Sequence, residues 1–291
     1  MNRIVWQTIL QVLPPLVVVG GLAVAVKVRR VRQGRHPFKE PLVRGPGESL
    51  RLQLAHIDEK MIFTLVALVG IPSLVAIAFS LDEQAGGRLH QVDNPFLWFG
   101  WMVPPIGCTL YLLKLLRELG QYQLGYEGER YVGGLLNETL RNKEYVYRDM
   151  ETGKVGNIDH VIVSRMGVFV VETKTRRKRT PKGGGEDYTI RYDGKQIVLA
   201  DGRTGSGCVT QARRNAEWLQ RFIAEAAAEK VRVTPILTFP GWRGPTRIKA
   251  DVKLINPKTI PRFVRAGRII LSEAQVQRIA HQIKQACRVK E

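Results

Sequence analysis

Two acidic side chains and a lysine stand at the ends of two short apolar runs in the middle of the chain. Residues 161–163 and 168–171 are rich in valine, and a short stretch with a glycine separates them, which predicts two strands joined by a hairpin. Asp159 precedes the turn, and Glu172 and Lys174 follow it. Because hairpin strands run antiparallel and side chains two residues apart share a face, we expect these three residues to meet at one end of the hairpin.

These residue types suit a site for Mg²⁺ or Mn²⁺. A hard cation prefers oxygen ligands, keeps several waters and binds a substrate phosphate, so Asp159 and Glu172 are the predicted metal ligands. The ammonium group of Lys174 can steady an attacking water or the charge that develops in the transition state. The alternative is a hairpin whose ends carry ordinary solvated charges, and an isolated triplet does not separate the two interpretations.

Two further motifs flank the hairpin. Residues 125–132 read GYEGERYV and lead into a helix with an apolar side, and residues 211–215 read QARRN. Their order around the Asp-(x12)-Glu-x-Lys core resembles the NERD family, the nuclease-related domain of the PD-(D/E)xK superfamily. The likeness spans about residues 120–239. It implies a restriction-endonuclease-like mixed sheet and hydrolysis of phosphodiester bonds in nucleic acid, with DNA as the expected substrate.

The resemblance also assigns roles to individual residues. Glu129, in the opening helix, would be the first acid of the site. Asp159 and Glu172 would be the metal-binding pair, and Lys174 would be the catalytic lysine. Gln211 would be the glutamine of the following helix that faces the site. No position of the motif is replaced in this chain.

A basic segment begins directly after the expected site lysine. It contains Arg176, Arg177, Lys178 and Arg179, and it opens a stretch, residues 176–207, that is richer in basic residues and glycine than the family pattern. We expect the four side chains to contact the phosphates of a nucleic acid. A solvated basic loop is the alternative.

Other residue types that often build sites are isolated in this chain. His160 follows Asp159 directly, so its side chain is expected on the opposite face of the strand, in a structural role. Cys108, Cys208 and Cys287 have no Cys or His partner at metal-binding spacing, and they suggest neither a disulfide framework nor a zinc site.

The composition adds a membrane region to this site. The 291 residues carry 45 Lys and Arg against 26 Asp and Glu, a net charge of +19. Three windows, residues 4–26, 61–81 and 95–113, are free of charged side chains, and each approaches the roughly 20 residues that cross a bilayer as a helix. The sequence therefore predicts three transmembrane helices within residues 1–119 and a cytosolic domain at 120–291.

Two of these windows have alternative interpretations. The first could be a signal peptide, but its apolar part is longer than is typical of one, and basic residues follow it at once, which favours an uncleaved anchor. The third could be a buried core helix, because Pro104 and Pro105 interrupt it. Trp98, Trp101 and Tyr111 near its ends instead fit the aromatic belt of a membrane interface.

Loop charges predict the orientation. Residues 27–60 contain nine Lys or Arg, whereas residues 82–94 contain only Arg88 beside three acids. The positive-inside rule then places the N-terminus outside and the domain after residue 113 in the cytosol, at the inner membrane. Expected partners are nucleic acid, DNA in particular, and the lipid bilayer. A homo-oligomer or a membrane complex stays open.

The sequence as a whole predicts an α/β protein, with N-terminal transmembrane helices followed by a mixed-sheet nuclease domain. The expected elements after the site hairpin are a hairpin around Asp193 and Gly194, an amphipathic helix at about 211–230, and a closing helix capped by Ser272. The leading function is a membrane-anchored, Mg²⁺-dependent nuclease. The alternative is a non-catalytic membrane-bound nucleic-acid-binding or assembly factor built on a nuclease fold.

Overall fold

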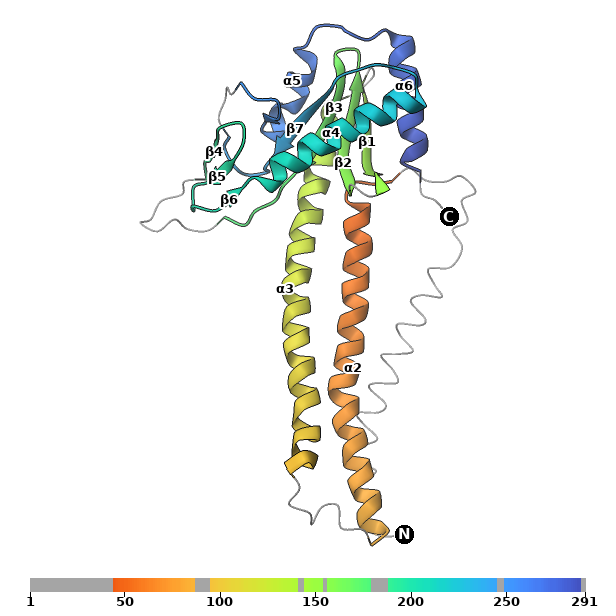
Figure 1. Ribbon diagram of the computed structural model, residues 1–291, viewed down its shortest axis with the longest axis vertical. Coiled ribbons are helices and arrows are strands. Elements are labelled where there is room, and N and C mark those ends of the chain that lie inside the picture. The colour runs from red at the N-terminus through yellow and green to blue at the C-terminus, as the bar shows by residue number, and fades with distance from the viewer. Residues whose placement is uncertain are drawn as a thin grey trace. The chain divides into compact units, whose positions relative to one another are not determined.

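The computed structural model describes residues 44–86, 95–140, 144–153, 156–178, 188–244 and 249–288 (Figure 1). The predicted span at 4–26 and the side chain of Arg179 lie outside these residues. Two compact units are present. The helical unit lies within Gln53–Gln121, and the sheet unit combines Glu40–Leu52 with Tyr122–Glu291.

The helical unit consists of most of α2 (Glu48–Gln84) and the first part of α3 (Pro95–Thr139). Among the described residues, only α2 is long and apolar enough to cross a membrane, over Glu48–Asp82, by length and composition. Its apolar side chains are exposed, with Phe63 and Leu74 each at 60%. This one helix, which contains the predicted span 61–81, gives limited support for a membrane anchor. The predicted span 95–113 is helical in α3, which is not among the candidate spans found over the residues that the structure describes.

Both long helices continue through boundaries that the sequence suggested. The span 61–81 continues a helix that begins at Glu48 and has 37 residues, and the third span and the opening helix of the nuclease-like domain form one helix of 45 residues. Pro72, Pro104 and Pro105 lie inside these helices without ending them. Local breaker residues therefore did not mark the helix ends here.

The sheet unit is built on a five-stranded mixed sheet of order β1-β2-β3-β7-β8. β1, β2 and β3 pair antiparallel, whereas β3 pairs with β7 and β7 with β8 in parallel. All residues of the central strand β3 are buried, which explains its almost unbroken apolar run. The strands are β1 (Tyr145–Glu151), β2 (Asn157–Ser164), β3 (Gly167–Thr173), β7 (Val233–Thr238) and β8 (Lys253–Leu254).

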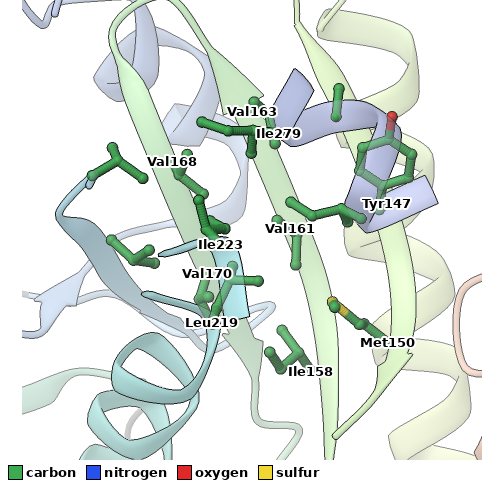
Figure 2. Packing of buried hydrophobic residues seen from close by; sticks show 14 of the residues in the cluster. Tyr147, Met150, Ile158, Val161, Val163, Val168, Val170, Leu219, Ile223 and Ile279 are labelled. Atoms are coloured by element: carbon green, nitrogen blue, oxygen red, sulfur yellow. The ribbon is translucent and has the colours of Figure 1, made fainter. Parts of the chain in front are cut away.

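Helices cover both faces of this sheet. On one face, valines of β2 and β3 pack with Leu219 and Ile223 of α4 (Gly207–Ala226) and with Ile279 of α6 (Glu273–Ala286), as Figure 2 shows. On the other face, the end of α3 packs with α5 (Ile260–Arg265), where Leu136 and Val264 are fully buried. A short 3-10 helix, η3 (Pro257–Thr259), leads into α5. The observed α/β architecture is the predicted one.

A second, smaller sheet lies between β3 and α4 along the chain. It contains β4 (Ile190–Tyr192), β5 (Ile197–Leu199) and β6 (Thr204–Gly205), in the order β4-β5-β6. β4 and β5 form the hairpin expected around Asp193 and Gly194, and Gly194 adopts the positive φ of 95° that such a turn favours. These strands pack with Val209, Leu237 and Trp242 in a core of their own.

The observed ends of α4 and α6 agree with the ends predicted from the sequence to different degrees. Ser272 caps α6 through a capping box with Gln275, as predicted. Helix α4 begins four residues before the expected Gln211, because Cys208 and Val209 extend its buried stripe toward the N-terminus. It also ends earlier than expected, and the chain turns there through Ala228 at a φ of 54°.

Candidate functional site

The β2–β3 hairpin brings the two predicted ligand acids together. Arg165 and Met166 form the turn, and the paired strands place Val171 opposite His160, so Glu172 follows next to Asp159 at the open end. The backbone N–H of Thr173 donates to Asp159 Oδ2 at 2.6 Å. Asp159 is 8% exposed and Glu172 is fully buried. Both side chains stand on the face of the sheet that α4 covers.

Lys174 lies at the centre of the cluster. Its Nζ is 2.6 Å from Glu172 Oε1 and donates to Gln211 Oε1 at 3.0 Å. Lys174 and Glu172 are two residues apart on the same face, and Gln211 reaches them from the first turns of α4. The structure therefore brings together Asp159, Glu172, Lys174 and Gln211.

Asn215 completes the surroundings of Glu172, and the sequence interpretation gave it no role. This buried side chain of α4 donates from Nδ2 to Glu172 Oε2 at 3.0 Å. It follows Gln211 by one helical turn, so the shared helix face was the signal that could have identified it. Burial raises the pKa of the Glu172 carboxyl, and the positive charge of Arg214 is among the effects that oppose this rise.

Glu129 approaches the site from α3. It is 8% exposed, and burial, together with the negative charges of Asp149 and Glu172, raises its pKa to about 8. Glu129 thus lies close enough to the hairpin acids to interact with them electrostatically. It is the first acid that the family resemblance assigned.

The cluster carries more carboxylates than nearby positive charge. Burial raises the pKa of Asp159 well above its usual value, and the charges of Glu172 and Glu129 raise it further. Burial also raises the pKa of Glu172, although Lys174 opposes that shift. For Lys174, burial would lower the pKa, but the charges of Glu172 and Asp159 outweigh it, so the pKa is raised. Protons or a cation are needed to balance these acids.

The metal-binding potential of the described residues rests on this acidic pair. No group of three or more His, Cys, Asp or Glu side chains in the described part of the chain is arranged to hold a metal ion. Asp159 and Glu172 supply oxygen donors, the type that Mg²⁺ and Mn²⁺ prefer. Their raised pKa values show that added positive charge would stabilise their ionised forms.

The basic segment leads away from Lys174 in a fixed backbone path. Trp242 Nε1 donates to the carbonyl oxygen of Arg176 at 3.1 Å, and Arg203 donates to that of Arg177 at 2.7 Å. The ammonium of Lys178 lies 3.9 Å from the ring centroid of Tyr188, a cation–π contact. The side chains at 176–178 are exposed to solvent, next to the site.

His160 lies away from this cluster, as the strand alternation predicted. It is fully buried on the α3 side of the sheet, and an added Cβ on Gly133 of α3 would stand 3.4 Å from its ring. Burial, with the positive charge of Arg148, lowers its pKa to about 3. A neutral imidazole in this layer has a packing role.

The fold and the cluster define the class of this domain. A mixed sheet places two acids and a lysine at the ends of adjacent strands, a helix before the hairpin contributes a third acid, and a helix after it contributes two amide side chains. Residues 124–240, less than half of the chain, match the nuclease-related domain, NERD, and this similarity supports a nuclease-related function. No curated protein and no solved structure matches the chain.

Proposed function

We propose that this protein is a membrane-anchored, metal-dependent nuclease that hydrolyses phosphodiester bonds of DNA. The observation that carries the proposal is the contact of Lys174 with Glu172 beside Asp159, inside the matched domain. Two carboxylates and an ammonium at one strand end are the groups that metal-assisted phosphodiester hydrolysis needs. Such hydrolysis is the reaction of the PD-(D/E)xK type that the sequence resembles.

The residues present fit a Mg²⁺ or Mn²⁺ ion, which Asp159 and Glu172 would hold. When bound, the ion would polarise the scissile phosphate and lower the pKa of a bound water. Lys174, held by Glu172 and Gln211, would orient the attacking water and stabilise the charge that develops on the phosphate. Asn215 fixes the second oxygen of Glu172 and thereby its rotamer.

The substrate contacts of this proposal lie in the basic segment. Arg176 and Arg177 have exposed side chains on a backbone that Trp242 and Arg203 hold in place. A preformed basic edge next to Lys174 would guide a phosphate backbone toward the cluster. The ammonium of Lys178 already contacts the ring of Tyr188, so its contact with a phosphate would be weaker than those of Arg176 and Arg177.

A second function, a non-catalytic nucleic-acid-binding or assembly factor, also has a specific observation in its favour. Both oxygens of Glu172 already have partners, Lys174 and Asn215, so the cluster is partly satisfied without a metal. Calorimetric titration of the purified full chain with Mg²⁺ and Mn²⁺ separates the two. The nuclease binds a divalent ion, and Glu172→Ala abolishes the binding heat. A chain that binds neither ion in the presence of DNA favours the assembly factor.

The membrane anchor is the part of the proposal that α2 supports. Its apolar side chains are exposed, as expected for a helix whose surroundings are lipid. We further propose that residues 4–26 and 95–113 also span the inner membrane, with the N-terminus outside and the sheet unit in the cytosol. A reporter active only outside the cytosol is then active when fused near residue 87 and silent when fused after residue 291. Equal activity at both positions contradicts three spans.

A further inference from the structure

A short segment before the apolar part of α2 belongs to the sheet unit. Residues 44–52, here called the strap, include the first turn of α2, yet they group with Tyr122–Glu291 and not with the remainder of that helix. The strap lies outside the matched domain, which begins at residue 124. It is therefore a part of this chain that the domain match does not account for.

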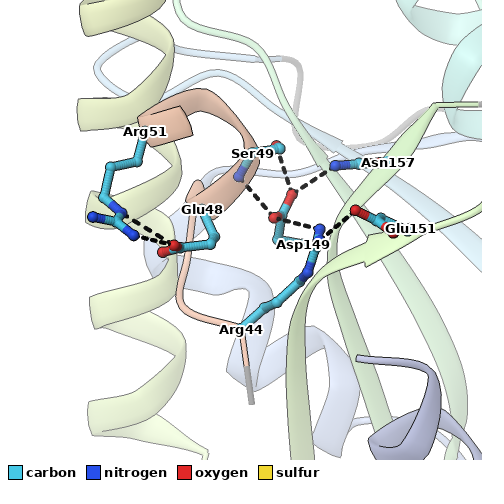
Figure 3. Close-up of polar contacts among 7 residues, drawn as sticks. All are labelled: Arg44, Glu48, Ser49, Arg51, Asp149, Glu151 and Asn157. Carbon is cyan, nitrogen blue, oxygen red and sulfur yellow. Dashed lines mark hydrogen bonds and ion pairs between the residues drawn. The ribbon is translucent and has the colours of Figure 1, made fainter. Parts of the chain in front are cut away.

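Asp149 of β1 holds the strap at one end. Its carboxylate accepts hydrogen bonds from the backbone N–H of Ser49 at 2.8 Å, from the Ser49 hydroxyl at 2.7 Å and from Asn157 Nδ2 at 2.9 Å (Figure 3). Arg44 forms ion pairs with both Asp149 and Glu151. Asp149 thus caps the start of α2 from a strand that lies 100 residues later in the chain.

The backbone around this anchor is specialised. Asp149 has a φ of 48°, a left-handed conformation that is uncommon for any residue other than glycine. It is 1% exposed, so its carboxylate depends on these protein donors. Gly47, directly before α2, has a φ of 71°. The contact of Ser49 with Asp149 therefore involves one uncommon backbone conformation, at Asp149, and follows a turn for which Gly47 is suited.

The strap also packs along one face of α3. An added Cβ on Gly47 would stand 2.8 Å from the ring of Tyr126 and 3.5 Å from Glu129 Oε2. One or two turns further on, an added Cβ on Gly133 would stand 2.8 Å from Pro46. The strap thus covers α3 at positions that include Glu129, the acid of the site that this helix contributes.

We infer that the strap is a positioning element of the nuclease site, in which Gly47 and Ser49 hold α3 so that Glu129 stays against the hairpin acids. The inference rests on the proposed nuclease function. An added Cβ on Gly47 of the strap would stand 3.5 Å from Glu129 Oε2, and the carboxyl of Glu129 is close enough to Asp149 and to Glu172 for the charges of both to raise its pKa. Residues that open an apolar, membrane-type helix thereby complete a site formed by residues far along the chain.

Gly47→Ala in the full chain tests this role. The added methyl group meets Tyr126 and crowds Glu129, so we expect kcat to fall by about 10-fold to 100-fold, with KM for DNA unchanged, because the basic segment is not disturbed. Gly153→Ala is the matched control. Gly153 has a similar φ of 68° in the same unit, but an added Cβ would have no neighbour within 4 Å.

Ser49→Ala serves as a second variant in case Gly47→Ala does not fold. It removes the hydroxyl that donates to Asp149 but keeps the backbone N–H, so a smaller fall in kcat is expected, again at unchanged KM. Hydrogen exchange of the α3 amides at 125–133 provides a readout that does not depend on catalysis. Both strap variants should speed this exchange relative to Gly153→Ala.

The outcomes separate the inference from the proposed function. The wild type could cleave DNA while folded Gly47→Ala and Ser49→Ala show the same kcat. That result overturns the positioning role and leaves the nuclease assignment intact. Absence of cleavage by the wild type overturns the nuclease assignment. In that case, faster hydrogen exchange of the amides at 125–133 in the strap variants than in Gly153→Ala still supports a role of the strap in holding α3 and Glu129. Equal exchange rates in the strap variants and Gly153→Ala overturn that role.

Discussion

Two groups of buried carboxylates in the sheet unit differ in how completely they are paired. Asp149 is surrounded by donors, since Ser49, Asn157 and Arg44 all contact its two oxygens. Glu172 forms an ion pair with Lys174 and accepts from Asn215, whereas Asp159 accepts from the backbone N–H of Thr173 and feels the charge of Lys174, with Glu129 close by. Burial is similar in the two groups, but the supply of donors is not.

This difference separates a structural acid from a candidate catalytic one. A buried carboxylate with enough donors stabilises the fold, whereas acids crowded together around one ammonium destabilise it until a proton or a cation joins them. Such strain persists at functional sites because the charge is needed for chemistry. The comparison predicts opposite effects for matched substitutions in the two groups.

The largest effect is expected on metal binding. Glu172→Ala removes one of two proposed ligands, so Mg²⁺ binding and DNA cleavage should both fall by at least about 100-fold. Asp149→Ala should lower stability but leave Mg²⁺ binding measurable, because Asp149 holds the strap. Calorimetry and a cleavage assay on both folded variants check the contrast. Equal loss of metal binding in the two would remove the distinction between the groups.

Stability should change in opposite directions. Asp149→Asn removes the charge that Arg44 and Ser49 compensate and should cost about 1–3 kcal/mol. Asp159→Asn keeps an oxygen for the Thr173 N–H and removes a crowded charge, so the metal-free protein should gain about 0.5–2 kcal/mol. Denaturant unfolding of the full chain without divalent ions measures both. A destabilised Asp159→Asn protein would show that the acids of the site are already balanced.

The pH dependence should come from Glu129. Its pKa of about 8 in the fold lies above the ordinary 4.5, so the folded state holds the proton more tightly. This contribution to stability is complete below pH 4.5 and is lost as the pH rises to about 8. Without metal, the free energy of unfolding of Glu129→Gln should therefore decline less steeply over that pH window than that of the wild type. Glu127→Gln, which changes an exposed acid of the same helix, should decline as the wild type does.

The smallest effect is expected at the basic segment. Changing the four basic residues at 176–179 to alanine should weaken duplex DNA binding and flatten its log-log salt dependence by about 0.9 for each lost phosphate contact. Changing Lys258 and Arg262, two exposed basic residues of η3 and α5, serves as the control and should leave the slope unchanged. If the slope of the salt dependence did not change in the 176–179 variant, the basic segment would be a solvated loop or a lipid contact and not a DNA contact.

Local patterns predicted the site hairpin well. Alternation in a strand and the antiparallel return of a hairpin were sufficient to place Asp159, Glu172 and Lys174 together. Gln211 contacts Lys174, 37 residues earlier in the chain. Only the family resemblance predicted that Gln211 faces the site, since helix periodicity alone indicated a surface residue. The roles of these residues in catalysis stay predictions.

Contacts between distant segments were not predictable in the same way. The strap meets Asp149 across 100 residues, and the left-handed backbone of Asp149 follows from tertiary contacts that no sequence pattern encodes. Gly125 and Gly128 lie inside α3, and an added Cβ on Gly128 would stand 2.0 Å from Thr175. Close packing, not turn formation, explains that glycine.

The most direct test of the central claim is a cleavage assay with the purified full chain and its Lys174→Met variant, on linear, circular and single-stranded DNA in Mg²⁺ and in EDTA. The wild type should cleave DNA in Mg²⁺ and not in EDTA. Lys174→Met should bind Mg²⁺ and DNA nearly as well but cleave at least about 100-fold more slowly, because the lysine acts on the transition state. Equal cleavage by the two proteins would contradict the assignment of this cluster as the active site.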